Sequence, residues 1–229
     1  MDGIHDFRVA LRQLRTILRC AGPIMRIEFT TSLKAELAWV DNSFARMRNA
    51  QVLMSRFNEY PDELKRIGSV ESEALRSTLV QETIDFNIFL GSGRFSQLIG
   101  DLLAIEPLQI LAVDGSTKVR KELKTFNKQL WKTITKRLRK NDHEDLHQLR
   151  IVAKRVRYMA LATEPIVGDS IRKHGDLAAK IQKILGEYMD SIIMSELVQT
   201  EEIRAYERKS QTRILHEWDK FVISNRKRW

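Results

Sequence analysis

Cysteine is almost absent from this sequence, since Cys20 is the only one among 229 residues. A single thiol excludes an internal disulfide and a cysteine-based zinc site, and it fits a reducing compartment. Glycine and proline are also scarce, with 10 and 4 residues, which excludes a collagen-like or low-complexity chain. The chain is long enough to bury a core, so we expect a folded protein.

Long hydrophobic runs are missing as well. No apolar stretch approaches the ~18 residues that a membrane-spanning helix needs. The first residues, Met1 to Asp6, have neither the basic nor the apolar segment of a signal peptide. We therefore expect a cytoplasmic protein without a membrane partner.

Strand patterns are hard to find, because no alternating β-branched segment is bounded by hairpin turns. Apolar residues instead recur at helical spacing along nearly the whole chain. Helix breakers divide this pattern at Gly22-Pro23, at Gly91-Ser92-Gly93 and from Pro165 to Gly168. The sequence thus predicts an all-α fold.

Acidic residues are rare in one part of the chain. Residues 117–157 contain 14 basic and 4 acidic residues, whereas residues 59–110 contain 9 acidic and 4 basic ones. The net charge of +9 is therefore concentrated in one region. Such a concentration creates a local positive field that attracts polyanions such as nucleic acid, anionic lipid or polyphosphate.

An internal repeat organises the basic residues. The frame His-x-x-Arg-x-x-x-(Arg/Lys)-x-x-Arg occurs twice, beginning at His5 and at His147. About 40 residues after each histidine a weaker match pairs residues 44–49 with residues 185–190. The repeat predicts two related halves, at about 1–110 and about 115–229.

Helical spacing places the members of each motif on one face. The first face has His5, Arg8, Arg12, Arg15 and Arg19, and the second has His147, Arg150, Lys154 and Arg157. Phe7, Leu11, Leu14 and Leu18 lie opposite the first face, and Leu149, Ala153, Val156 and Ala160 lie opposite the second. Stacked like charges repel, and guanidinium groups match phosphate oxygens, so both faces favour an anionic ligand over a merely solvated surface.

A third basic surface follows mostly i, i+4 spacing on the segment before the second motif, with Lys121, Lys128, Lys132, Lys136 and Lys140. Because this surface is rich in lysine, a solvated helix face is favoured over a ligand site there. Asp190 and Glu187 could hold a cation, but a role in orienting arginines or in a helix contact is favoured.

The sequence resembles the CHAD family of α-helical domains over essentially the whole chain. The resemblance rests on residues 5–15, on residues 146–158 and on Leu185-Gly186 with Asp190. It implies two pseudo-symmetric four-helix bundles in one compact domain, with a central basic channel that binds inorganic polyphosphate. The family's Arg-Asp pair is Arg48-Asn49 here, and Gln13 stands where a second arginine is common.

We therefore expect a non-catalytic module that binds polyphosphate without a metal or cofactor. The resemblance implies a cytoplasmic protein that associates with polyphosphate granules. The candidate ligands of polyphosphate are His5, Arg8, Arg12, Arg15, Arg19, Arg48, Lys128, Lys132, Lys136, His147, Arg150, Lys154, Arg155, Arg157 and Lys180. Binding of RNA, DNA or another polyanion is the alternative, although no aromatic residue interrupts the basic faces. A phosphatase or phosphotransferase is less favoured, because the faces contain no convergent carboxylates.

Overall fold

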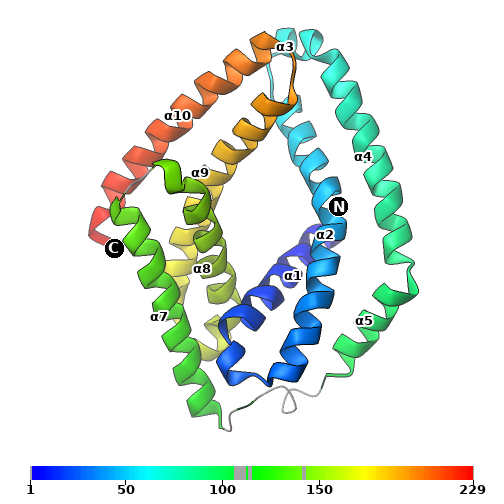
Figure 1. The fold of residues 1–229 in the computed structure, drawn as a ribbon. Helices are drawn as coiled ribbons and strands as arrows, with labels where there is room; N and C mark the ends of the chain where they lie inside the picture. Colours follow the sequence, from blue (N-terminus) through cyan, green and yellow to red (C-terminus); the bar gives the residue numbers. More distant parts are fainter. Residues whose placement is uncertain (1, 106–111, 113–114, 141–142, 229) are drawn as a thin grey trace. The chain divides into compact units, whose positions relative to one another are not determined.

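The computed structural model describes residues 2–105, 112, 115–140 and 143–228, and it confirms the all-α prediction (Figure 1). No β-strand occurs among these residues. The α-helices are α1 (Asp2–Cys20), α2 (Ile27–Asn58), α3 (Asp62–Ile67), α4 (Ser69–Leu90), α5 (Gly93–Leu103), α7 (Ser116–Lys140), α8 (Leu146–Val167), α9 (Arg172–Leu197) and α10 (Glu201–Asn225). Short 3-10 turns lie at Gly22–Ile24, His143–Asp145, Asp169–Ile171 and Arg226–Arg228.

The helices end where the sequence places its breakers. Pro23 lies at the start of the 3-10 turn that follows α1. The Ser92 side chain caps α5 by accepting a hydrogen bond of 3.3 Å from the Phe95 amide. Helix α8 contains Pro165 in its last turn and stops before Gly168, whose φ of +97° favours glycine.

The described residues form two compact units. Unit 1 comprises Met1–Leu37, Ile105–Gly186 and Trp218–Trp229, and unit 2 comprises Ala38–Ala104 and Glu187–Glu217. Helices α2, α9 and α10 therefore contribute residues to both units, and each unit draws on both halves of the sequence. Residues 106–111 and 113–114, where we expect the two halves to join, lie outside the described ranges.

In unit 1, α8 packs against both α7 and α1. The predicted apolar stripe of α8 is buried at Leu149, Ala153, Val156 and Ala160, each at most 3% exposed. On α1, Leu11 and Leu18 are buried, whereas Phe7 and Leu14 are half-buried. The apolar backs of both motif helices thus hold them in the unit 1 core.

Helix α9 approaches α8 closely at Gly175. A Cβ atom at this position would lie 2.9 Å from the Cβ of Ala160, closer than side chains normally pack. The glycine therefore allows the two helices to come together. One residue earlier, His174 stacks on Trp131 of α7, with ring centroids 4.0 Å apart and planes 10° apart.

Burial lowers the pKa of His174 in the folded protein. Protonation therefore favours the unfolded chain, and the stability that neutral His174 provides is lost as pH falls below about 6.5, the usual value for histidine. We expect His174→Phe, which keeps an aromatic ring at Trp131, to lose less stability than the wild type between pH 7 and pH 5.5. Urea unfolding at each pH measures this difference, with His216→Gln on the exposed surface of α10 as the control. Equal losses in wild type and His174→Phe would contradict the assignment.

Unit 2 has its own core, built from α2, α4, α9 and α10. Leu53, Phe57, Leu75, Met194 and Ile203 are among its buried members. Phe44 of α2 and Phe86 of α4 add a ring contact with centroids 4.4 Å apart. Of the helices that the structure describes, none has the length and apolar character to cross a membrane.

Candidate functional site

The basic face of α1 gathers arginines at close spacing. Arg8, Arg12 and Arg15 are half-buried, and Arg19 is exposed. Burial lowers the pKa of Arg15, and the positive charges of Arg19 and Arg12 lower it further. These arginines therefore repel one another, and an anion would relieve that repulsion. The side chain of His5 lies outside the described part of the structure.

The second motif forms a similar face on α8. His147 is exposed, whereas Arg150, Lys154, Arg155 and Arg157 are half-buried. Arg157 donates a hydrogen bond of 3.4 Å from Nη1 to Oε1 of Gln182 on α9, and its guanidinium lies 5.5 Å from the ring centre of Tyr158. These contacts hold the guanidinium of Arg157 in place on the α8 face.

Arg150 lies beside Gly186 at the point where α9 passes α8. The position of a Cβ on Gly186 would be 3.8 Å from Nε of Arg150 and 4.0 Å from Nη2. Both distances are ordinary van der Waals separations, and Nε of Arg150 is buried. Gly186 of the quoted motif thus lies next to Arg150 of the second motif copy.

The two motif copies meet at Tyr158. Nη1 of Arg12, in the first copy, donates a hydrogen bond of 3.3 Å to the hydroxyl of Tyr158 on α8. Arg157, in the second copy, lies over the ring of the same tyrosine. Residues 146 positions apart in sequence are thereby joined in one unit. Tyr158 belongs to the quoted motif, directly after Arg157, yet sequence reasoning did not select it as a site residue.

Cys20 marks a second place where the copies approach each other. Burial raises the pKa of its thiol, while the positive charges of Arg155 and Arg19 act in the opposite direction. Arg155 of α8 therefore lies near the C-terminal end of α1. Its Nε is buried and has no hydrogen-bond partner among the residues that the structure describes.

The predicted lysines of α7 lie on the exposed side of this helix. Lys128, Lys132 and Lys136 are exposed, while Leu123, Asn127, Ile134 and Leu138 are buried. A groove of about 440 Å³ lies beside Lys132, Lys136 and Lys140, and an ion pair of Arg137 with Asp145 forms part of its lining. Lys180 of α9 is exposed as well. In the described part of the chain, the side chains of these four predicted lysines make no hydrogen bond or ion pair.

Arg48 is the predicted site residue that belongs to unit 2. It is exposed on α2 and lines a pocket of about 340 Å³ together with Glu187 and Asp190 of α9. The two segments of the weaker repeat match, residues 44–49 and 185–190, therefore both contribute side chains to the lining of this pocket. Within the described ranges, no three His, Cys, Asp or Glu residues are grouped so that they could hold a metal ion.

Comparison with known proteins decides the family. The family model described as "CHAD domain" matches residues 1–199 of this chain. The chain belongs to the CHAD domain family. The solved CHAD domain from the plant Ricinus communis has the same fold, with a TM-score of 0.59 and 22% identity, covering 93% of this chain and 75% of that one.

Two uncharacterized proteins from strains of Mycobacterium tuberculosis, CDC 1551 / Oshkosh and ATCC 25618 / H37Rv, are also similar to this CHAD domain. Each is 24% identical over 214 residues, which cover 85% of this chain. The chain spans 39% of the length of these relatives.

Proposed function

We propose that this CHAD domain binds inorganic polyphosphate, without altering it, on the arginine faces of α1 and α8. The observation that carries the proposal is the junction at Tyr158, where Arg12 and Arg157 from the two motif copies converge. A linear chain with one negative charge per phosphate suits a surface on which many cations follow one another. Family membership supports the same ligand, because the motif residues quoted for the family form these two faces.

Arg155 adds independent support. A buried N–H without an acceptor costs on the order of 1–3 kcal/mol. The Nε of Arg155 is such a group in the structure, and it lies near the cationic end of α1. A phosphate oxygen at this place would accept the hydrogen bond and offset the positive charge.

The non-catalytic part of the proposal rests on the surroundings of His147. A nucleophilic or basic histidine is normally oriented by a carboxylate. In the described part of the chain, a carboxylate lies next to His143: Oδ1 of Asp219 is 3.0 Å from its Nε2. His143 is not a member of either motif, so this carboxylate does not orient His147.

Removing one arginine from either face should weaken polyphosphate binding. We expect Arg8→Ala and Arg150→Ala each to reduce affinity by about 1–3 kcal/mol, or roughly 5- to 150-fold, because each loses a charge-assisted contact. Fluorescence anisotropy with labelled long-chain polyphosphate measures the change. Arg76→Ala removes an exposed arginine from α4 of unit 2 and should bind like the wild type.

Leu149→Ala separates loss of a ligand contact from loss of the fold. Leu149 is 3% exposed in the unit 1 core, so its truncation should cost about 2–5 kcal/mol of stability through a cavity. Leu14 of the apolar stripe on α1 is only half-buried, so Leu14→Ala should leave a smaller cavity and cost less stability. An Arg8→Ala or Arg150→Ala protein that binds normally but unfolds early would assign these arginines to structure instead.

A further inference from the structure

The pocket at Arg48 has features that differ from the polyphosphate faces. It is built within unit 2 from α2, the turn after it, α9 and α10. Its volume of about 340 Å³ lies at the small end of the roughly 300–1,000 Å³ typical of ligand sites. A pocket of this size suits a small molecule and not a polymer.

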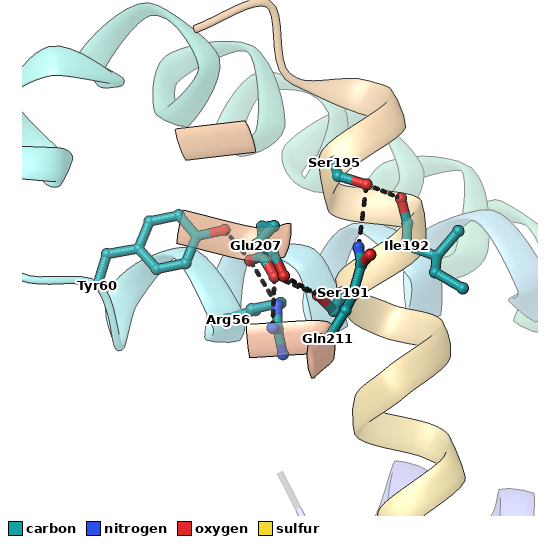
Figure 2. A network of polar contacts seen from close by, with 7 residues as sticks. All are labelled: Arg56, Tyr60, Ser191, Ile192, Ser195, Glu207 and Gln211. Carbon is teal, nitrogen blue, oxygen red and sulfur yellow. Dashed lines mark hydrogen bonds and ion pairs between the residues drawn. The ribbon is translucent and has the colours of Figure 1, made fainter. Parts of the chain in front are cut away.

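Two of its lining residues are fixed by a buried carboxylate. Glu207 is fully buried and accepts hydrogen bonds from Nε of Arg56 at 2.7 Å and from Nη2 at 2.5 Å (Figure 2). The hydroxyl of Tyr60 also donates to Glu207, as does Oγ of Ser191 at 2.5 Å. Arg56 and Tyr60 both line the pocket, so part of its wall is rigid before any ligand arrives.

Arg56 keeps donor capacity toward the pocket. A guanidinium has five N–H donors, and the contacts with Glu207 use Nε and Nη2. Nη1 makes no hydrogen bond with a residue that the structure describes, and the Arg56 side chain is 15% exposed. These donors can therefore receive a carboxylate or phosphate oxygen. Arg213 of α10 and Arg48 of α2 add two exposed guanidinium groups to the lining.

Carboxylates balance these cations. Glu187 and Asp190 line the pocket from α9, and Glu59 lines it from the turn after α2. The charge of Asp190 acts to raise the pKa of Arg56, so the two groups lie within electrostatic reach of each other. The lining contains three arginines, Arg48, Arg56 and Arg213, against these three carboxylates, and Glu207 also pairs with Arg56, so the pocket is not positive overall. A polyanion would meet these carboxylates, whereas a ligand with both charges finds a partner for each.

We propose that this pocket binds a small zwitterion of amino-acid size. Its anionic group lies at Arg56 and Arg213, its ammonium group at Glu187, and its apolar part against Val52 and Ile214, which also line the pocket. Arg48, which the sequence analysis names among the polyphosphate ligands, lines this pocket but is not part of the proposed faces of α1 and α8. The cationic residues of the polyphosphate proposal named above for α1 and α8 are in unit 1, so either proposal can fail without the other.

The test begins with thermal unfolding of the full chain in the presence of single probes. The probes are the proteinogenic L-amino acids and phosphoethanolamine, with acetate and methylammonium as ligands that carry one charge only. We expect at least one zwitterion to stabilise the protein and to bind with a Kd of about 1 mM or tighter by calorimetry. No binding by any probe, or equal binding by acetate or methylammonium, would overturn the proposal.

Two variants then locate the binding. Arg213→Gln and Glu187→Gln change exposed side chains, so the fold should survive, and each should weaken binding of the stabilising zwitterion by about tenfold or more. The matched controls are Arg208→Gln and Glu196→Gln, exposed residues on the opposite faces of the same two helices. Wild-type affinity in Arg213→Gln and Glu187→Gln would place the ligand elsewhere and overturn the assignment.

Discussion

Polyphosphate affinity should fall by roughly 300-fold or more when monovalent salt rises from 50 to 200 mM. If six cations neutralise phosphates and each contributes about 0.7 to the slope of log K against log salt, the slope is about −4. The faces of α1 and α8 supply more than six cationic side chains. Burial and the charges of Arg19 and Arg12 lower the pKa of Arg15, so these cations repel one another before an anion binds. Titrations with labelled polyphosphate at several salt concentrations give the slope.

The arginine variants sharpen this test. Replacing a residue that contacts a phosphate should make the slope shallower by about 0.7, and Arg150→Ala is the variant to use. Arg76→Ala should leave the slope unchanged, since it lies on α4 in unit 2. A slope weaker than about −1 for the wild type would mean that few phosphates are neutralised, which is incompatible with binding along both faces.

Glu207→Gln should strongly destabilise the protein, by about 3–5 kcal/mol of unfolding free energy. The substitution keeps the size of the side chain but removes the charge that pairs with Arg56, and breaking a buried ion pair leaves an uncompensated charge. Glu207 is fully buried and holds residues of α2, α9 and α10 together (Figure 2). Urea denaturation followed by circular dichroism measures the loss.

The control for this variant is Glu201→Gln on the same helix. Glu201 pairs with Arg208 at 2.5 Å, but both side chains are largely exposed. Surface pairs contribute little to stability, so this variant should unfold close to the wild type. Similar stability of Glu207→Gln and Glu201→Gln would show that the buried network does not hold unit 2 together.

Helical periodicity was sufficient to predict the fold class and the orientation of the motif helices. The stripe from Leu149 to Ala160 is buried as expected, because apolar residues at helical spacing must face a core. The cationic side chains of the same helix were correctly placed on another face, where they are half-buried or exposed. These features depend on residues within a few turns of one another.

Contacts between distant segments could not be predicted in the same way. The hydrogen bond of Arg12 with Tyr158 and the pairing of Arg56 with Glu207 join residues 146 and 151 positions apart. Neither spacing leaves a periodic signal, and Glu207 resembles any helical glutamate in the sequence. The division into units also follows packing, since α2, α9 and α10 continue from one unit into the other. Whether the two sequence halves form pseudo-symmetric bundles stays a prediction.

The most direct test of polyphosphate binding is competition at a fixed ionic strength of about 0.1 M, where exposed charges are partly screened. Long-chain polyphosphate, pyrophosphate, orthophosphate and a single-stranded RNA are each used to displace labelled polyphosphate from the domain. We expect long polyphosphate to displace it at far lower phosphate concentration than pyrophosphate, orthophosphate or RNA, and to be recovered with its chain length unchanged. Displacement by orthophosphate or RNA as effective as by long polyphosphate, or shortening of the recovered polymer, would contradict the account.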